Sequence, residues 1–383
     1  MLDQSASVVK ADSAWRYRAL LERLLEPCDV RFNGDRPFDL QVHDERLYAR
    51  VVAEGSLGFG EAYMDGWWDC AQLDEAMCRI LRHRVDAAVR PWRDVPRALM
   101  ARVVNLQTPR RSYRVGEHHY DIGNDMYRRM LGRYMAYSCG YWAEATDLDA
   151  AQWAKMDLIA RKLRLEPGMR VLDVGCGWGE LARFLAEQYG VEVVGVTISR
   201  EQAEFGRELC AGLPVDIRLQ DYRAVDERFD RIVSVGMFEH VGHKNYRTFM
   251  ETCWRLLPAD GLLLLHTIGN NITSSVTDPW IARYIFPNSM VPSAAQVADA
   301  ADDLLILEDW HNFGTHYDPT LCAWFANFDA HWPEFADLHG ERFYRMWRFY
   351  LLSCAGSFRA RMNHLWQLVL SPRGVPGGYV APR

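Results

Sequence analysis

The sequence predicts an α/β fold in which helices cover both faces of a mostly parallel sheet and a smaller, mostly helical domain comes first. Three observations predict this fold. Short apolar runs recur between residues 170 and 268, helical patterns separate them, and a glycine-rich loop follows the first run. Alternation of this kind is typical of βαβ units, whose parallel strands are buried on both faces.

Five apolar runs have the length of buried strands, and we expect a helix after each of the first four. They are residues 170–174, 191–196, 215–219, 229–235 and 261–268. Farther along the chain, residues 319–360 have helical spacing. The apolar stretch 365–371 that follows is predicted to form a final edge strand.

The N-terminal part of the chain has a different pattern. Residues 14–26 and 71–84 carry apolar positions at helical spacing, with a glycine-rich stretch between them. We therefore assign residues 1–100 to a helical N-terminal domain, 101–118 to a linker with a Pro-Arg-Arg break, and 119–383 to the α/β domain.

Composition excludes several classes of protein. Of the 383 residues 49% are hydrophobic, yet the longest aliphatic run is Leu262–Leu265, far short of the roughly 20 residues that span a bilayer. No charged segment followed by an apolar one opens the sequence. The nine cysteines are odd in number and form no C-x-x-C pair, so we expect reduced thiols in the cytoplasm.

The net charge of −7 conceals a basic segment, Arg79–Arg114, which has ten arginines and only Asp86 and Asp94 as acids. Two interpretations are open. The arginine stems cover apolar surface on a solvated helix face, or the segment binds phosphate groups. No nucleic-acid motif accompanies it, so we expect lipid headgroups and no nucleic acid.

The strongest chemical signal is RVLDVGCGWGELARFLAEQYG (170–190), a predicted strand, a loop and a predicted helix. Asp173, Gly175, Gly177 and Gly179 form a D-x-G-x-G-x-G pattern. Glycines permit close approach of the backbone to a ligand, and a helix N-terminus presents free N–H groups beside them. The pattern is neither a Walker loop nor the G-x-G-x-x-G of dinucleotide binders. It predicts a nucleotide-type site at the carboxyl edge of the sheet; the alternative is a structural tight turn.

The second predicted strand, in VEVVGVTISREQ (191–202), lacks the acid that grips ribose hydroxyls in many such sites. Thr197, Ser199 and Gln202 offer neutral hydrogen bonds instead, and Ser199 is also a good helix N-cap. In LQDYR, Asp221 is a candidate for an adenine amino group and Tyr222 for stacking. The alternative for Tyr222 is a half-buried aromatic at the edge of the sheet.

The glycine pattern resembles motif I of class I S-adenosylmethionine-dependent methyltransferases, and further blocks occur with it in order. They include EGSLGFGEAYMDGWWD (54–69), EHHYDIGNDMY (117–127), YSCGYW (137–142), FDRIVSVGMFEHVGHKNY (229–246), LLLLHTIG (262–269), EDWHNFGTHYDPTL (308–321) and SCAGSFRARMNHLWQ (353–367). Together they resemble the family of cyclopropane-fatty-acyl-phospholipid synthases over essentially the whole chain.

This resemblance implies a Rossmann-like methyltransferase fold and S-adenosyl-L-methionine as methyl donor. The implied reaction adds the methyl group to a cis double bond of an unsaturated phospholipid acyl chain, and loss of a proton to a bound bicarbonate then closes a cyclopropane ring. The resemblance also implies a homodimer, and peripheral contact with the inner face of the membrane through the N-terminal domain.

The resemblance further assigns residues to the reaction. Glu239, His266 and Tyr317 are expected to hold the bicarbonate through side chains, and Cys139 and Ile268 mainly through backbone groups. Three further residues are placed by resemblance alone. Tyr137 and Ser138 are expected at the methionine end of the cofactor, and Cys354 at the active site without a nucleophilic role. The alternative for Cys354, which lies beside the small residues Ala355 and Gly356, is a residue that packs against a neighbouring helix.

FEHVGH (238–243) also permits a metal interpretation, since Glu239, His240, His243 and His266 are all possible zinc ligands. The order E-H-x-x-H matches no helical zinc signature, and Gly242 interrupts the helix that such a signature requires. We therefore expect no metal. His240 is interpreted as a packing residue, and His243 as a solvated one near a helix start.

Two other functions remain open from the sequence. One is a methyltransferase that acts on another lipid or on a small molecule. The other is a lipid-binding protein without activity, against which the retention of Glu239, His266 and Tyr317 argues.

Overall fold

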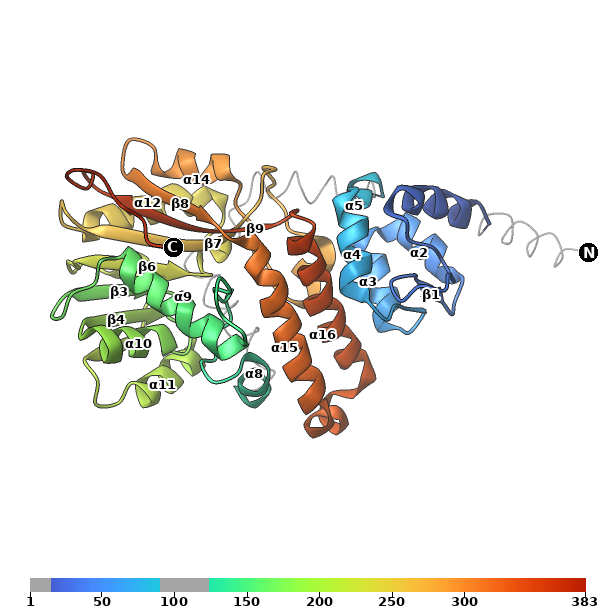
Figure 1. Cartoon of the computed structure of the whole chain (residues 1–383), viewed down its shortest axis with the longest axis horizontal. Helices are drawn as coiled ribbons and strands as arrows, with labels where there is room; N and C mark the ends of the chain where they lie inside the picture. Colours follow the sequence, from blue (N-terminus) through green and yellow to red (C-terminus); the bar gives the residue numbers. More distant parts are fainter. Residues whose placement is uncertain (1–14, 90–123) are drawn as a thin grey trace, which may run out of the picture. The chain divides into compact units, whose positions relative to one another are not determined.

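The computed structural model describes residues 15–89 and 124–383 (Figure 1). By contact the chain divides into two compact units, each of which is described by itself. In the described residues the helical unit comprises 15–89, 278–287 and 328–362, and the sheet unit comprises the remainder. The segments 278–287 and 328–362, which were assigned to the α/β domain, belong with the N-terminal residues in this division. The predicted boundary at residue 100 lies outside the described residues. The predicted linker, 101–118, lies outside the described residues.

The sheet unit is built on seven strands in the order β5-β4-β3-β6-β7-β9-β8. Its five parallel strands confirm the five apolar runs as strands, with bounds shifted by up to two residues. They are β3 Arg170–Val174, β4 Glu192–Thr197, β5 Val215–Leu219, β6 Arg231–Val235 and β7 Leu262–Gly269. The strand order reverses between β3 and β6, so the carboxyl ends of these two strands flank a topological switch point.

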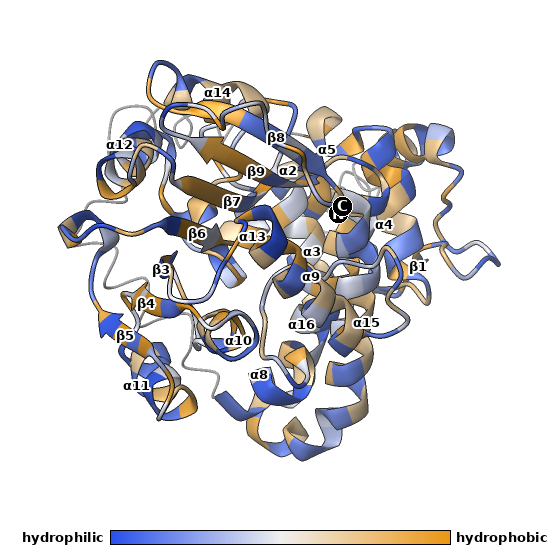
Figure 2. Ribbon diagram, turned by 60° about the vertical axis from the view of Figure 1, so that its left-hand side comes forward, coloured by the Kyte–Doolittle hydropathy of each residue, from blue (hydrophilic) through white to orange (hydrophobic). Residues whose placement is uncertain are grey.

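The stretch 365–371 does form a strand, β9 His364–Ser371, but its predicted place at the edge is wrong. It runs antiparallel between β7 and β8 Ile306–Asn312. All eight residues of β9 are buried, as an interior strand requires, and Figure 2 colours most of β7 and β9 as hydrophobic. The sequence did not predict β8, because its half-exposed ILEDWHN lacks a continuous apolar run.

Helices cover both faces of this sheet, as predicted. Val171 of β3 packs into a core with α9, α10 and α11, whereas Leu172 and Val174 pack into a second core with α12 and α14. The predicted helix after 215–219 is only a 3-10 turn, η2 Tyr222–Ala224. The helices are α8 Asn124–Leu131, α9 Leu148–Lys162, α10 Glu180–Tyr189, α11 Arg200–Leu209, α12 Tyr246–Leu256, α14 Ala294–Ala301 and α15 Tyr317–His331.

The helical unit contains a helix over residues 15–25 and one short pair of strands. The predicted helical stretch 319–360 is divided, because Pro333 lies in a 3-10 turn after α15 and Gly340 of α16 has a φ of 72°. The strands and other α-helices of this unit are β1 Gln41–Val42, α2 Arg46–Glu54, α3 Ser56–Met64, β2 Trp68–Asp69, α4 Leu73–Arg82, α5 Val85–Ala88, α13 Pro279–Tyr284 and α16 Ala336–Arg359.

Close packing of α16 on α4 explains the small residues of SCAGSF. A Cβ at Gly356 would lie 2.5 Å from the backbone oxygen of Asp74 and 2.8 Å from the backbone nitrogen of Cys78. No atom fits at that separation, so glycine is required for the two backbones to approach. The small residues therefore accommodate a neighbouring helix.

Only the first part of the arginine-rich segment lies within the described residues, since 90–123 are outside them. Arg79 pairs with Glu75 at 2.8 Å, and Arg84 lies 3.4 Å from Asp86. The positive charges of these two arginines are therefore partly neutralised by acidic residues close to them in the sequence. No helix in the described ranges is both long and apolar enough to cross a membrane.

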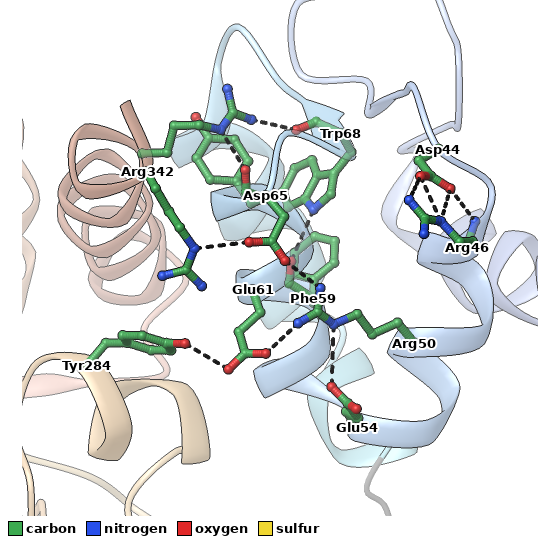
Figure 3. Close-up of polar contacts among 12 residues, drawn as sticks. Asp44, Arg46, Arg50, Glu54, Phe59, Glu61, Asp65, Trp68, Tyr284 and Arg342 are labelled. Atoms are coloured by element: carbon green, nitrogen blue, oxygen red, sulfur yellow. Dashed lines mark hydrogen bonds and ion pairs between the residues drawn. The ribbon is translucent and has the colours of Figure 1, made fainter. Parts of the chain in front are cut away.

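An ionic network joins α2, α3, α13 and α16 within the helical unit (Figure 3). Arg50 of α2 pairs with Glu61 and, at 2.8 Å, with Asp65. Tyr284 of α13 donates a hydrogen bond of 2.8 Å to Glu61, and Arg342 of α16 lies 3.0 Å from Asp65. The side chains of Arg50 and Glu61 are only 19% and 10% exposed, so solvent screens their attraction less than that of surface pairs.

Tyr284→Phe is expected to lower the free energy of unfolding by about 1–2 kcal/mol, because it removes a hydrogen bond to a charged carboxylate. The measurement is urea denaturation followed by tryptophan fluorescence. Tyr17→Phe, at an exposed tyrosine of the same unit, is the control and should change stability by less than about 0.5 kcal/mol. Equal effects of the two substitutions would contradict a stabilising role of the network.

Candidate active site

The glycine loop lies between β3 and α10, where the chain turns at the switch point. Gly175, Gly177 and Gly179 have φ values of 83°, 55° and 88°, a region that favours glycine. The backbone N–H groups of Gly175 and Cys176 donate to the carbonyl of Val196, at 2.9 and 3.1 Å. The loop is therefore held against β4.

The glycines differ in their surroundings. A Cβ at Gly175 would lie 2.7 Å from the side chain of Met237, whereas a Cβ at Gly177 would meet no described atom within 4 Å. Gly175 thus permits packing against the segment after β6. At Gly177 the positive φ and the space beside the backbone together fit a ligand that approaches the main chain.

Asp173 lies at the end of β3 and is 1% exposed. Its Oδ2 atom has no hydrogen-bond partner among the described residues, and burial raises its pKa to about 7, against the charge of Lys155. Lys155 of α9 is also buried, and its Nζ donates to Ser138 Oγ at 2.9 Å. Burial lowers the pKa of this lysine to about 8. Asp173 Oδ2, a buried polar atom next to the glycine loop, can therefore accept a hydrogen bond from a ligand.

Lys155 was not predicted as a site residue. Its signal in the sequence is a lysine among the apolar positions of the segment 148–163. Such a residue on a buried helix face is rare unless it is paired.

Tyr137, Ser138 and Cys139 lie in the connection between α8 and α9. The side chain of Gln152 donates to the carbonyl of Ser138 at 2.9 Å, and the ring centroid of Tyr137 lies 5.3 Å from that of Trp324 in α15. The backbone N–H of Gly140 donates to Thr320 Oγ1 at 3.1 Å. The connection is therefore fixed to α9 on one side and to α15 on the other.

Glu239 follows β6 in a 3-10 turn and is 7% exposed. Its Oε1 accepts a hydrogen bond of 2.7 Å from the backbone N–H of Ile268, at the end of β7. Its Oε2 has no partner within the described part of the chain. Burial raises the pKa of this carboxyl to about 7, although the hydrogen bond from Ile268 opposes the shift. Burial therefore favours the protonated form of Glu239.

His266 lies on β7 opposite Val235 of β6 and is 1% exposed. Its Nδ1 lies 3.3 Å from the amide nitrogen of Gln367, and its Nε2 finds no partner among residues 15–89 and 124–383. Burial and the charges of Lys155 and Lys162 hold its pKa well below the usual value. The structure thus brings Glu239, Ile268 and a neutral His266 together at the carboxyl ends of β6 and β7.

Tyr317 and Cys139 contact the same helix, α15. Tyr317 begins this helix, and its ring centroid lies 6.0 Å from that of Trp324. The sulfur of Cys139 lies 3.9 Å from Thr320 Oγ1, one turn along. Burial raises the pKa of the Cys139 thiol well above its usual value, so the sulfur remains protonated.

Cys354 lies in α16 of the helical unit, whereas the other five predicted catalytic residues lie in the sheet unit. Burial raises the pKa of its thiol to about 12, with a smaller contribution from Asp278. A thiol with this pKa is a weak nucleophile at neutral pH. Its place at the active site remains a prediction from the resemblance.

Thr197, Ser199 and Gln202, the residues considered for a ribose, form hydrogen bonds with one another. Thr197 Oγ1 donates to Gln202 Oε1 at 2.9 Å and accepts from the backbone N–H of Ser199 at 3.2 Å. Ser199 caps α11 by accepting from the N–H of Gln202 at 3.4 Å, which confirms the predicted N-cap. Their contacts with a ribose remain predictions.

Asp221 and Tyr222 have structural partners in the described chain. The carboxylate of Asp221 accepts from the side chain of Arg223 at 2.9 Å and caps η2. Tyr222 packs edge-on against Phe249 with ring centroids 5.6 Å apart, as a half-buried aromatic would. Adenine contacts by these residues stay predictions.

The histidines of FEHVGH lie in two short turns, with His240 in η3 Phe238–His240 and His243 in η4 His243–Asn245. Burial lowers the pKa of His243. Within the described ranges, no three or more His, Cys, Asp or Glu residues are grouped so that they could hold a metal ion.

The sequence of this chain is similar to the sequences of known proteins. The family model described as mycolic acid cyclopropane synthetase matches residues 107–368. The chain is 51% identical over 368 residues to cyclopropane-fatty-acyl-phospholipid synthase of Escherichia coli K12, covering 96% of both chains. It is 36% identical to cyclopropane mycolic acid synthase 2 of Mycobacterium leprae, over 66% of this chain and 91% of that protein.

Solved structures share the fold. A crystal structure of a mycolic acid cyclopropane synthase complexed with SAH and CTAB has a TM-score of 0.64 and 35% identity, and the match covers 68% of this chain and 98% of that one. Coclaurine N-methyltransferase, bound to N-methylheliamine and SAH, has a TM-score of 0.68 and 25% identity over 82% of this chain and 98% of that one. The Rossmann-like methyltransferase fold is confirmed, and the chain belongs to the mycolic acid cyclopropane synthetase family.

Proposed function

We propose that this chain is a cyclopropane-fatty-acyl-phospholipid synthase. It transfers the methyl group of S-adenosyl-L-methionine to the cis double bond of an unsaturated phospholipid acyl chain, and a proton then leaves the added methyl group as the ring closes. The observation that carries the proposal is the 51% identity over 96% of both chains with the Escherichia coli protein of that name. The geometry of the sheet unit supplies groups that suit each step.

The residues around the glycine loop fit the nucleoside and methionine parts of the donor. We assign the backbone of Gly175, Gly177 and Gly179 and the carboxyl of Asp173 to it, together with Tyr137 and Ser138. When bound, S-adenosyl-L-methionine supplies a methyl group made electrophilic by its positive sulfur. Thr197, Ser199, Gln202, Asp221 and Tyr222 complete the proposed cofactor site.

Methyl addition leaves a positive charge on the acyl chain, which must be shielded from water. Three aromatic rings, those of Tyr137, Tyr317 and Trp324, lie near Ser138 and Cys139. The ring centroid of Trp324 lies 5.3 Å from that of Tyr137 and 6.0 Å from that of Tyr317. The faces of such rings attract cations by their quadrupoles. We assign these three residues to the surroundings of the charged intermediate.

We assign proton removal to a bicarbonate held by Glu239, His266 and Tyr317, with Cys139 beside them. The support is that Glu239 Oε2 and His266 Nε2 are buried without partners in the described chain, and such atoms are costly unless a ligand binds them. A protonated Glu239 and a neutral His266 both donate hydrogen bonds to an anion. The N–H of Ile268 already donates to Glu239, so we assign Ile268 to orienting that carboxyl.

We further propose peripheral contact with the inner face of the membrane and a homodimer in the cytoplasm. The substrate class supports the first, since a phospholipid acyl chain must be reached from the bilayer, and the basic segment 79–114 suits anionic headgroups. Sedimentation with vesicles tests the contact. Light scattering during gel filtration tests the dimer.

A methyltransferase that acts on another lipid or on a small molecule is the second candidate. The similarity to coclaurine N-methyltransferase, with a TM-score of 0.68, favours it. The 39% identity over 266 residues to a probable fatty acid methyltransferase of Pseudomonas putida also favours it.

The purified protein should convert vesicles of cis-monounsaturated phospholipid in the presence of methyl-labelled S-adenosyl-L-methionine. Mass spectrometry of the released acyl chains should show the gain of one methylene, with label in a cyclopropane ring. Vesicles of saturated phospholipid are the control and should gain nothing. Label confined to a headgroup, to a branched methyl or to a soluble product would exclude the cyclopropane reaction and support the second candidate.

Gly177→Ala should weaken binding of S-adenosyl-L-methionine by at least tenfold, because its Cβ occupies the space assigned to the ligand. Gly168→Ala is a matched control. Gly168 also has a positive φ, 82°, and a Cβ there would also meet no described atom within 4 Å. Both substitutions should cost about 1–2 kcal/mol of stability through strain. Titration calorimetry that finds equal affinities for the two variants would contradict the assigned site.

Glu239→Gln should change how stability depends on pH. The folded-state pKa of Glu239, about 7, exceeds its usual 4.5, so the folded state binds the proton more tightly. The resulting stability is complete below pH 4.5 and is lost as pH rises through 7, by up to about 3 kcal/mol. Urea denaturation between pH 4.5 and 8, without ligands, should show a smaller loss for Glu239→Gln. Parallel profiles would contradict the buried, protonated carboxyl.

A further inference from the structure

A row of polar side chains runs across three neighbouring strands of the sheet, β7, β9 and β8. His266 of β7 pairs directly with Gln367 of β9, which pairs with His311 of β8. Directly opposed residues of antiparallel strands project from the same face. Gln367 is 0% exposed, although a buried amide is costly unless it is hydrogen-bonded. The family resemblance gave Gln367 no role.

The contact of Gln367 with His266 has a direction. The amide nitrogen of Gln367 lies 3.3 Å from His266 Nδ1, and an amide nitrogen donates hydrogen bonds but does not accept them. With the amide in this orientation His266 Nδ1 is the acceptor, and Gln367 Oε1 has no partner among the described residues. In a neutral imidazole the single proton then lies on Nε2. This Nε2 is the buried atom without a partner among the described residues.

The charge state of His266 follows from its surroundings. Burial is the largest effect that opposes a second proton on the ring, and the charges of Lys155 and Lys162 on α9 oppose it further. Lys162 Nζ lies 3.3 Å from Asp309 and 3.1 Å from His311 Nδ1, so its charge is paired on the side of β8. His266 is thus a neutral donor in surroundings that disfavour the imidazolium.

We propose that Gln367 is a positioning residue that fixes His266 as the Nε2–H tautomer, so that this imidazole donates a hydrogen bond to the anion without protonating it. The inference rests on the proposed function, because the anion is the base of that reaction. The base must keep its lone pair and negative charge until it takes the proton from the added methyl group. An imidazolium at the same place would transfer its own proton and neutralise the base.

The amide is chemically suited to this task. A carboxylate at position 367 would accept a hydrogen bond from Nδ1–H and stabilise the imidazolium. An aliphatic side chain would leave Nδ1 without a partner, and the choice of tautomer would be lost. Gln367→Glu and Gln367→Leu therefore change the imidazole in different, distinguishable ways.

The first test observes the imidazole directly. The full chain is labelled with 15N-histidine, and two-bond 15N–1H spectra are recorded at pH 7.5, with His266→Gln identifying the signals of His266. The wild-type protein should show a neutral ring protonated at Nε2. Gln367→Leu should show both tautomers, and Gln367→Glu a doubly protonated ring. An Nδ1–H ring in the wild type, or an unchanged ring in Gln367→Leu, would overturn the inference.

Val369→Ala is the matched control for packing. Val369 is 0% exposed and lies two residues along β9, so it projects from the same face. Its truncation removes buried atoms but no hydrogen bond, and the His266 signals should stay as in the wild type. If Gln367→Leu does not fold, Gln367→Asn replaces it, since the shorter amide cannot reach Nδ1 and should give the same mixture.

The second test measures turnover as a function of bicarbonate. Gln367→Leu should lower kcat/KM for bicarbonate by on the order of 10- to 100-fold, through a higher KM, a lower kcat or both. The affinity for S-adenosyl-L-methionine should be unchanged. Turnover of Gln367→Leu that equals that of Val369→Ala would overturn the inference. A wild-type protein that forms no cyclopropane would refute the proposed function instead, and the spectra would still decide the tautomer.

Discussion

The hydrogen bond between the N–H of Ile268 and Glu239 Oε1, 2.7 Å long, joins the loop after β6 to the end of β7. It leaves one carboxyl oxygen bonded to the backbone and the other buried without a partner among the described residues, so a single contact orients the acid. His266 lies two residues before Ile268 on the same strand, with its ring on the same side of the sheet as Gln367. The separation of His266 and Ile268 is therefore set by β7 itself, whereas the 3-10 turn after β6 places Glu239.

Burial gives these groups their chemical character. The same low-dielectric surroundings raise the pKa of Glu239 and lower that of His266, so both tend toward their neutral forms. Neutral donors are suited to a base that must remain charged until the proton is transferred. Asp173 and Lys155, also buried, are shifted toward neutrality for the same reason. One physical effect, desolvation, thus acts both beside the glycine loop and at the carboxyl ends of β6 and β7.

The parts of the fold that were predicted from the sequence are those with local signals. β3, β4 and β7 are short segments rich in aliphatic residues, and the glycine loop requires residue types that few other turns need. β8 was missed because its residues are half exposed, and β9 was placed at the edge because nothing local shows that β8 covers it. The helical unit, which includes 278–287 and 328–362, depends on contacts between distant segments. Lys155 and Gln367 could not be assigned a role from the sequence, because each role depends on a tertiary contact. Lys155 contacts Ser138 Oγ, and Gln367 contacts His266 Nδ1.

The position of β9 between β7 and β8, both of which precede it in the sequence, has a consequence for synthesis of the chain. During translation β3 to β7 emerge in order and can pair at once, but β7 keeps an open edge until residues 364–371 follow. β8 emerges before β9, the strand with which it pairs in the described part of the chain, and so cannot join the sheet on its own. The nascent protein thus carries a long apolar edge, a surface prone to pairing with other chains. A chaperone that shields β7 at this stage would raise the yield of folded enzyme without altering its final stability.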